Sequence, residues 1–242
     1  MTSSDEWPFP QRRKPKIDDP DYLGSKGLTL ALQKVITTRL VGMRELDILD
    51  VGCGQKPFYP FLRNHCRRYV GTDMVATGHL VDIVAQAESL AVPSDSFDLV
   101  LELSVLEHVD DPHKAVAELH RVLRRGGMVF ASTHGFFPWH PSPQDHWRWT
   151  QTGLRLLFTR HGHFADVEIF PTRGTVSGVF FLLAHYLYRY CSIKRWRRPF
   201  RGPLTTTANL LGEVLDRATP SLHDMDTPVT ALPEFFVVAR KE

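Results

Sequence analysis

The chain has 242 residues, 43% of them hydrophobic, which is enough to bury a full core within one α/β domain spanning residues 1–242. The formal net charge of +2 is nearly balanced and argues against wholesale wrapping of nucleic acid. The three cysteines, Cys53, Cys66 and Cys191, are an odd set without a Cys-x-x-Cys pair. They therefore indicate neither a disulfide framework nor a zinc ribbon, and they fit a reducing cytoplasm.

The amino-terminal segment, residues 1–20, is polar and interrupted by prolines, so it predicts a flexible arm whose basic cluster is solvated. The segment contains no apolar stretch of the signal-peptide kind. Residues 28–41 follow with apolar side chains at helical spacing. This spacing predicts an amphipathic helix just before the first strand, where it can help to cover a ligand.

Residues 46–54 read Leu-Asp-Ile-Leu-Asp-Val-Gly-Cys-Gly and predict a buried parallel strand that turns sharply at its carboxyl end. Gly52 and Gly54 lack a Cβ, so they can adopt positive φ and let a flat ligand lie against the backbone. Asp50 offers a carboxylate to a cationic group of that ligand. Asp73 ends the next apolar run, about 20 residues after the glycines, where nucleotide-binding crossovers hold a ribose-binding carboxylate. These features together predict a nucleoside cofactor.

The loop lacks the third glycine of Gly-x-Gly-x-x-Gly, which makes NAD or FAD the weaker interpretation, and it is not a phosphate-binding loop. The Asp-x-Gly-x-Gly segment resembles motif I of the class I S-adenosylmethionine-dependent methyltransferases. An ordinary strand-to-helix turn is the alternative that this motif alone leaves open.

Further elements follow in an order typical of that family. Residues 58–66 predict the first crossover helix, residues 69–72 the second strand and residues 80–83 the third. The segment beginning at Gln86 resembles the family's Asp-Ala-Glu-x-Leu-Pro-Phe block, in which an acidic side chain accepts a hydrogen bond from the adenine amino group. The Gln86 amide oxygen can still accept that bond, and the resemblance implies that the following N–H, of Ala87, reaches a ring nitrogen.

Residues 100–112 form the second stretch whose pattern is informative about fold and function. A strand ends near Ser104, and a short turn presents Glu107 and His108. Pro112 opens a helix that is expected to stop at Gly126-Gly127 and to feed a fifth strand over residues 128–131. These blocks resemble the Leu-Glu-His-Val and Leu-Lys-Pro-Gly-Gly blocks of the methyltransferase-11 branch, in register across residues 46–133.

The resemblance implies a Rossmann-like α/β fold: a seven-stranded, mostly parallel sheet with helices on both faces and a helical insertion before the last strand. It implies S-adenosylmethionine bound over residues 46–133, across the carboxyl ends of the first, second and fourth strands. The cofactor-binding residues expected on this basis are Asp50, Gly52, Cys53, Gly54, Asp73, Met74, Gln86, Ala87, Leu103 and Ser104.

His108 has two interpretations. Its position at the end of a central strand and its near-neutral pKa suit a general base that takes a proton from an acceptor hydroxyl. In the second interpretation, the His108 side chain has no role as a base and serves to orient the loop over the sulfonium. In the ubiquinone-biosynthesis O-methyltransferases, which this block resembles, two glutamates and this histidine bind magnesium. Here Ser104 replaces the first glutamate, and Glu107 with His108 makes a poor magnesium site, so no metal is expected to be required.

Residues 134–150 predict a substrate loop rich in aromatic and imidazole rings. Asp145 and His146 are catalytic candidates with His108, because they can polarise a hydroxyl; His140, Trp147 and Arg148 are substrate-binding candidates. The alternative is that Asp145 pairs with Arg148 and Trp149 packs in the core. The loop resembles an element of methyltransferases from bacterial surface-glycan and natural-product clusters. A zinc site is disfavoured, since the histidines lack regular ligand spacing.

The carboxyl-terminal part predicts a helix over residues 152–160 and strands over residues 165–170 and 234–239. Between these two strands lies an insertion, residues 172–232. Within it, residues 176–187 are apolar nearly all round and too few to cross a bilayer, and a basic cluster with Trp196 follows. Residues 176–198 therefore predict a lid or a homodimer face, with a peripheral membrane helix as the second interpretation.

The predicted function is S-adenosylmethionine-dependent methyl transfer to an oxygen of a small-molecule, sugar or lipid-linked acceptor. The predicted location is the cytoplasm, with peripheral association with a membrane as the second interpretation. A non-catalytic partner-binding protein that keeps the fold is the alternative from another class, and the intact glycine loop and Asp73 speak against it. A nucleic-acid methyltransferase is disfavoured by the charge balance and by the absence of an Asn/Asp-Pro-Pro-Tyr/Phe block, so no nucleic-acid partner is expected.

Overall fold

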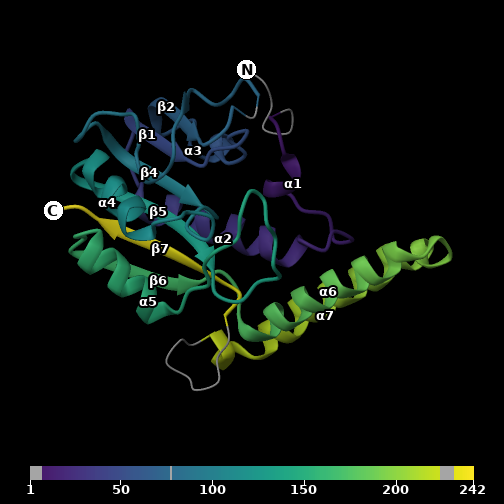
Figure 1. The fold of residues 1–242 in the computed structure, drawn as a ribbon. Coiled ribbons are helices and arrows are strands. Elements are labelled where there is room, and N and C mark those ends of the chain that lie inside the picture. Colours follow the sequence, from purple (N-terminus) through teal and green to yellow (C-terminus); the bar gives the residue numbers. More distant parts are fainter. Residues whose placement is uncertain (1–6, 77, 224–231) are drawn as a thin grey trace.

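The computed structural model describes residues 7–76, 78–223 and 232–242. Within them one sheet of seven strands runs in the order β3-β2-β1-β4-β5-β7-β6 (Figure 1). Neighbouring strands are parallel except β7, which is antiparallel to both β5 and β6. The predicted sheet type is confirmed. The strands are β1 Leu46–Val51, β2 Cys66–Asp73, β3 Ile83–Val84, β4 Phe97–Leu103, β5 Leu123–His134, β6 Asp166–Pro171 and β7 Glu234–Arg240.

Helices cover both faces of the sheet because successive side chains of its buried strands point to opposite sides. Ile48 of β1 packs with helix α2 (Tyr22–Arg39), whereas Leu49 packs on the other face with α4 (Pro112–Val122) and α5 (Gln151–Leu156). Helix α5 continues into a π-helical turn, η1 (Leu157–His161). All six residues of β1 are buried. This two-sided burial fixes the register of β1 and so the position of the loop that follows it.

Several predicted elements differ in extent: for example, the helix predicted over residues 28–41 begins at Tyr22, and the strand predicted over residues 128–131 spans Leu123–His134. The crossover helix expected over residues 58–66 is only α3 (Tyr59–Leu62), because β1 already pairs with Cys66 and the His65 carbonyl accepts from Leu46. The third strand overlaps its predicted range only at Ile83, since just the last two residues of β2 pair with it. Helix α4 ends before the glycine pair, and Gly126, with φ of 80°, lies within β5.

Part of the amino-terminal arm is packed against the domain: the prediction of a solvated basic cluster holds for Arg12, Lys14 and Lys16, which are exposed, and is wrong for Arg13, which is buried. Residues 1–6 lie outside the described residues. A short helix, α1 (Pro10–Arg13), ends in a buried arginine. The Arg13 guanidinium donates to the carbonyls of Trp7 at 2.8 Å and Pro57 at 2.5 Å. The arm is thereby tied to the chain that follows the glycine loop.

The insertion forms a helical hairpin that projects from the sheet (Figure 1). Helix α6 (Thr175–Ile193) is longer than the predicted apolar run, a 3-10 turn η2 (Arg195–Phe200) follows, and α7 (Arg201–Ala218) returns. A further turn is η3 (Pro220–His223), and residues 224–231 of the insertion lie outside the described residues. Among the described helices, none combines the length and the apolar character needed to span a bilayer.

Candidate active site

A cavity of about 1760 Å³ lies at the carboxyl ends of β1, β2 and β4. Its walls come from the glycine loop, the amino-terminal arm, the beginning of α2, the loop after β5 and helix α6. Open α/β sheets bind their ligands at this edge, where strand ends and loops meet. The cavity is therefore the candidate active site.

The glycine loop leaves the main chain open at one end of this cavity. Gly52 and Gly54 have φ of 64° and 49°, in the left-handed region that favours glycine. A Cβ on Gly52 would collide with Val105, whereas a Cβ on Gly54 would enter open space with no atom within 4 Å. The Gly54 N–H donates to Asp73 Oδ2 at 2.9 Å, which fixes the carboxylate at the cavity edge. Since each carboxylate oxygen can accept twice, Asp73 keeps acceptor sites for two ligand hydroxyls.

Asp50 does not line the cavity. It is buried, and its Oδ2 accepts a hydrogen bond from the Tyr69 hydroxyl at 2.7 Å. Burial raises the pKa of Asp50 to about 7. The side chain thus joins β1 to β2 behind the loop. Of the expected cofactor-binding residues, Gly52, Gly54, Asp73, Met74, Gln86, Ala87 and Ser104 line the cavity, and Asp50, Cys53 and Leu103 do not.

His108 lines the cavity at the turn that follows β4. Its Nδ1 lies in hydrogen-bonding contact with the Gln144 carbonyl oxygen. Because a carbonyl only accepts, Nδ1 carries the proton and Nε2 keeps its lone pair. Burial lowers the pKa of His108, so the neutral ring predominates at pH 7. The geometry leaves Nε2 available as a base.

Glu107 is fully buried beneath the histidines. Its Oε2 accepts from the Thr133 hydroxyl at 2.8 Å, and its Oε1 lies 3.0 Å from His134 Nε2. Its main-chain oxygen accepts from the N–H groups of His146, at 2.8 Å, and Trp147, at 3.2 Å. Burial raises the pKa of the Glu107 carboxyl to about 7. Glu107 thus links the end of β4 to β5 and to the substrate loop.

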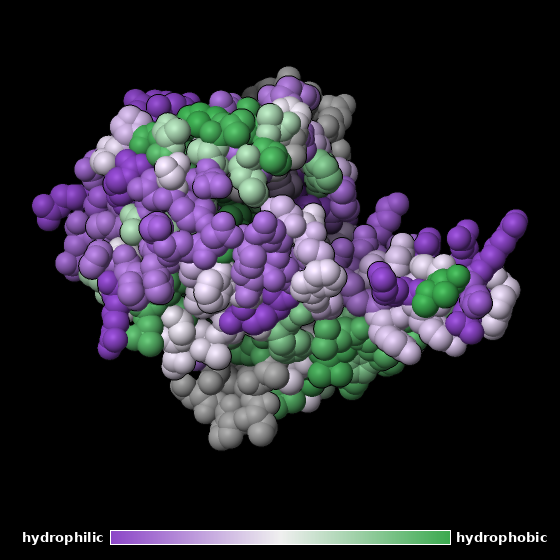
Figure 2. Space-filling view, in the orientation of Figure 1, coloured by the Kyte–Doolittle hydropathy of each residue, from purple (hydrophilic) through white to green (hydrophobic). Residues whose placement is uncertain are grey.

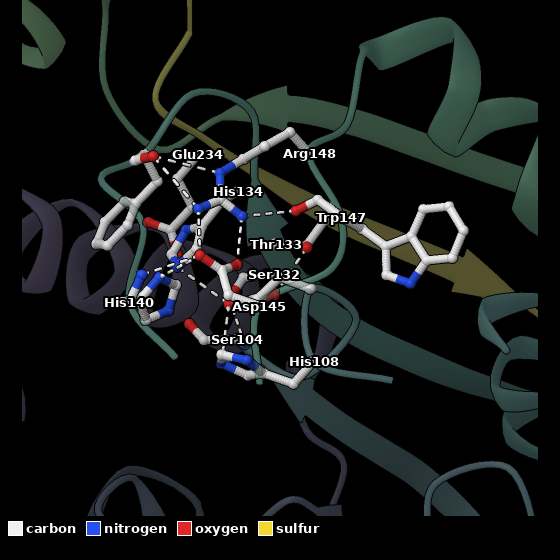
Figure 3. Close-up of polar contacts among 12 residues, drawn as sticks. Ser104, His108, Ser132, Thr133, His134, His140, Asp145, Trp147, Arg148 and Glu234 are labelled. Carbon is white, nitrogen blue, oxygen red and sulfur yellow. Dashed lines mark hydrogen bonds and ion pairs between the residues drawn. The ribbon is translucent and has the colours of Figure 1, made fainter. Parts of the chain in front are cut away.

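Asp145 and Arg148 form a two-pronged ion pair, at 2.5 Å and 2.7 Å, as the structural alternative predicted. Arg148 holds the pKa of Asp145 well below its usual range. The Asp145 carboxylate also accepts from the His140 main-chain N–H at 2.9 Å. Figure 3 shows His108, His134 and His140 gathered around this carboxylate, and the His140 ring centroid lies 5.0 Å from that of His108. The ion pair holds the loop so that His140 lines the cavity.

Other predicted residues lie behind the cavity wall. His146 Nε2 bonds Gln144 Oε1 at 2.6 Å, and the Trp147 indole N–H donates to the Val109 carbonyl at 2.8 Å. Trp149 packs against the main core, as the structural alternative predicted. Asp145, His146, Trp147 and Arg148 do not line the cavity, so the catalytic and substrate-binding roles expected of them are not supported by direct access to it.

Two groups of side chains in the described part of the chain could offer three metal-ligand atoms within 4.8 Å of one another. The groups are Glu107 with His134 and His140, and His108 with His140 and Asp145. Both depend on His140, and the Asp145 carboxylate is already neutralised by Arg148. The expectation that catalysis requires no metal stays a prediction.

Several cavity residues were missed in the sequence. They belong to the arm, to the first turns of α2, to α6 and to β7, and no local motif marks them, because only tertiary packing brings these segments to the sheet edge. They include Phe9, Arg12, Ser25, Leu182, His185, Tyr186, Arg189 and Glu234.

The strand order with an antiparallel β7, the glycine turn after β1 and the carboxylate after β2 define the class I methyltransferase fold. A crystal structure of an S-adenosylmethionine-dependent methyltransferase from Archaeoglobus fulgidus is similar in fold, with a TM-score of 0.53 and 13% identity over 96% of this chain and 98% of that one. Residues 49–131 match the family model described as a methyltransferase domain. Residues 49–131 are thus similar to a methyltransferase domain, and the chain has the class I S-adenosylmethionine-dependent methyltransferase fold.

Two curated relatives carry more specific names. A malonyl-[acyl-carrier protein] O-methyltransferase of Serratia marcescens is 30% identical over 125 residues, which are 46% of this chain and 48% of that protein. A ubiquinone biosynthesis O-methyltransferase of Pseudomonas paraeruginosa is 32% identical over 107 residues, or 38% and 46% of the two chains. The chain spans about half the length of the curated relatives it matches.

Proposed function

We propose that the protein transfers a methyl group from S-adenosylmethionine to an oxygen atom of a small-molecule, sugar or lipid-linked acceptor. The observation that carries the proposal is a single cavity with an open glycine turn and Asp73 at one end and neutral His108 at the other. Relatives named as O-methyltransferases support oxygen as the acceptor atom.

The residues at the glycine end fit a nucleoside. The bare main chain at Gly54 admits a flat group, and Asp73 can accept hydrogen bonds from two ribose hydroxyls. The Gln86 amide oxygen, on the cavity wall, can accept from an adenine amino group. Bound S-adenosylmethionine supplies a sulfonium-activated methyl group, so the protein has to align donor and acceptor and manage one proton.

The residues at the other end can manage that proton. With the cofactor bound, His108 Nε2 would take the proton of the acceptor hydroxyl as the hydroxyl oxygen bonds to the methyl carbon. The methyl–sulfur bond would break in the same displacement, and S-adenosylhomocysteine would leave as the neutral thioether. The hydrogen bond from His108 Nδ1 to the Gln144 carbonyl holds the ring in this tautomer. The Asp145–Arg148 pair and buried Glu107 act indirectly, by holding the loop that carries Gln144 and His140.

Calorimetry with S-adenosylhomocysteine tests the cofactor end. Asp73→Asn keeps an oxygen for the Gly54 N–H but removes the charge, so we expect about 10- to 100-fold weaker binding, the loss of one to two charge-assisted hydrogen bonds. Asp166→Asn is the matched control, since Asp166 is exposed at the start of β6. Failure of the wild-type chain to bind, or equal binding by Asp73→Asn, would overturn the cofactor assignment.

Methyl transfer tests the acceptor atom. The wild-type chain is incubated with labelled S-adenosylmethionine and with phenolic, sugar and lipid-linked hydroxyl acceptors, and mass spectrometry locates the added methyl. We expect a methyl ether on at least one acceptor class. A methyl found only on nitrogen or carbon would overturn the oxygen assignment while leaving methyl transfer intact.

A further inference from the structure

Helix α7 has polar residues inside and apolar residues outside. Its buried positions include Thr205, Asn209, Glu213 and Asp216. A helix on a water-exposed surface normally shows the opposite distribution. The apolar residues turned outward, each 40–61% exposed, are Leu204, Leu210, Leu211, Val214 and Leu215.

Specific polar contacts fix this orientation of α7. The Asn209 amide donates to the carbonyls of Ile17 and Asp19, both at 2.8 Å. Glu213 pairs with Lys26 at 2.5 Å, and Asp216 Oδ1 accepts from the Ser177 N–H at 2.9 Å. A rotation of α7 that buried its leucines would break these contacts and leave buried charges unpaired, which is costly. The outward apolar face is therefore built into the fold.

Helix α6 carries a second exposed apolar row. Its members recur at helical spacing along one face and are 40–68% exposed: Val179, Leu183, Tyr186, Tyr190 and Ile193. Figure 2 shows hydrophobic surface along the hairpin and hydrophilic residues at its free end. We call the five exposed residues of α7 and these five of α6 the hairpin apolar surface. Contiguous exposed apolar surface of this kind marks an interaction site.

The free end of the hairpin is strongly basic. The sequence holds no aspartate or glutamate between Glu168 and Glu213, but it holds Lys194, Arg195, Arg197, Arg198 and Arg201 at the turn. Trp196 lies among them and is 68% exposed. The Arg197 guanidinium lies 4.2 Å from the Tyr190 ring centroid. Cations, Trp and Tyr beside an apolar helix face are the combination that lies at a membrane interface.

We propose that the hairpin docks on an anionic lipid bilayer, with the hairpin apolar surface in the headgroup and acyl boundary and the basic turn among the headgroups. A second copy of the chain fits less well, because a two-fold interface pairs a surface with itself and so brings like charges into one assembly. Anionic headgroups instead complement the basic turn. Docking rests on this surface and is independent of the proposed methyl transfer.

Docking on a bilayer also restricts the chemical class of the methyl acceptor. This inference rests on the proposed function. Leu182, Tyr186 and Arg189 of α6 line the cavity, and Tyr186 also belongs to the hairpin apolar surface. The cavity wall and the docking surface thus share one helix. A hydroxyl on the headgroup of an amphiphile could reach the cavity while its acyl chains stay in the bilayer.

Vesicle flotation of the full chain tests the docking. Vesicles of phosphatidylcholine alone are compared with vesicles in which about one third of the lipid is phosphatidylglycerol. We expect flotation with the anionic vesicles and about tenfold less with the neutral ones. Protein that stays in the soluble fraction on anionic vesicles overturns the proposal.

Two pairs of variants locate the surface. Leu211→Gln with Val214→Gln removes apolar area, and Arg195→Gln with Arg198→Gln removes charge; each is expected to reduce anionic-vesicle binding about tenfold. The matched controls are Val41→Gln, an exposed apolar residue after α2, and Arg125→Gln with Arg160→Gln. Unchanged binding in both hairpin variants overturns the proposal.

Two further readouts separate the remaining outcomes. Retained binding of S-adenosylhomocysteine by the hairpin variants shows that they are folded, and it reports on the cofactor site without lipid. Light scattering measures the oligomeric state of the wild-type chain and of Leu211→Gln with Val214→Gln. A wild-type dimer that this variant dissociates, without vesicle binding, would assign the surface to a second copy and overturn the membrane proposal.

Discussion

The two ends of the cavity are built in different ways. At the glycine end, two adjacent parallel strands, β1 and β2, stop at the same sheet edge, and one hydrogen bond from Gly54 to Asp73 joins their loops. At the other end, His108 and His140 are held by contacts between the β4 turn and the loop after β5. Strand register positions the first end, and hydrogen bonds from one loop to main-chain carbonyls of the other position the second. Variants at the two ends should therefore fail in different measurements.

The largest difference between the effect on turnover and the effect on cofactor binding is expected for His108→Asn. The asparagine amide can still donate to the Gln144 carbonyl, but no base remains at the Nε2 position. We expect kcat to fall about 100-fold, at the low end for loss of a general base, with affinity for S-adenosylhomocysteine within about twofold of wild type. Rate assays over pH check the assignment, since wild-type activity should fall as acid protonates His108, whose pKa is lowered by burial. A variant as fast as wild type would leave alignment alone as the source of the rate.

A smaller effect is expected for Arg148→Gln. The substitution removes both contacts to Asp145, whose pKa Arg148 holds below its usual range. A lowered carboxyl pKa adds stability above its unfolded value and loses it as pH falls, so the variant should lose this contribution at neutral pH. We expect the free energy of unfolding to drop by about 1–2 kcal/mol in urea titrations. Arg160→Gln, on the exposed η1 turn, is the control; equal losses in both would show that the Asp145 pair does not hold the loop.

A third variant, Glu107→Gln, lies beneath the junction of the two loops and is expected to change how stability depends on pH. Burial raises the pKa of Glu107 from 4.5 to about 7, so the folded protein binds this proton more tightly than the unfolded chain. Its contribution to stability is full below pH 4.5 and is lost as pH rises to about 7. Glutamine removes this dependence, and the slope of unfolding free energy against pH should change by up to about 1.4 kcal/mol per unit in that window.

The control for Glu107→Gln is Glu45→Gln, at an exposed position before β1. Urea midpoints of the wild-type chain and both variants, measured from pH 5 to pH 8, give the three slopes. If the Glu107 variant kept the wild-type slope, the carboxyl would not titrate in this window, and its role would be limited to its hydrogen bonds.

Elements with a strong local pattern were predicted closely. The aliphatic run of β1 and the glycines that follow it lie where expected, and Pro112 opens α4 with Asp111 capping it. Weaker patterns gave wrong extents. The helix after the glycine loop is four residues long, because pairing of β1 with Cys66 starts β2 early. Local preference cannot anticipate where a neighbouring strand begins to pair.

The candidate site was predicted unevenly for the same reason. Asp73 and His108 stand directly at strand ends, so their sequence positions place them at the cavity. Asp145 and Arg148 have side chains that suit a substrate site equally well, but they satisfy each other. Whether two such side chains face a ligand or one another depends on loop conformation, which composition does not reveal.

By itself, the sequence determined the sheet, the glycine turn and the carboxylate after β2, because buried apolar runs and missing Cβ atoms act within a few residues. Tertiary structure alone decided that the arm around Arg13 is packed, that Asp50 turns away from the cavity, and that α7 shows its leucines to the outside. These outcomes depend on contacts between residues more than ten positions apart in the sequence. The contacts pair buried polar groups that would be costly to leave unpaired, and no local sequence pattern encodes them.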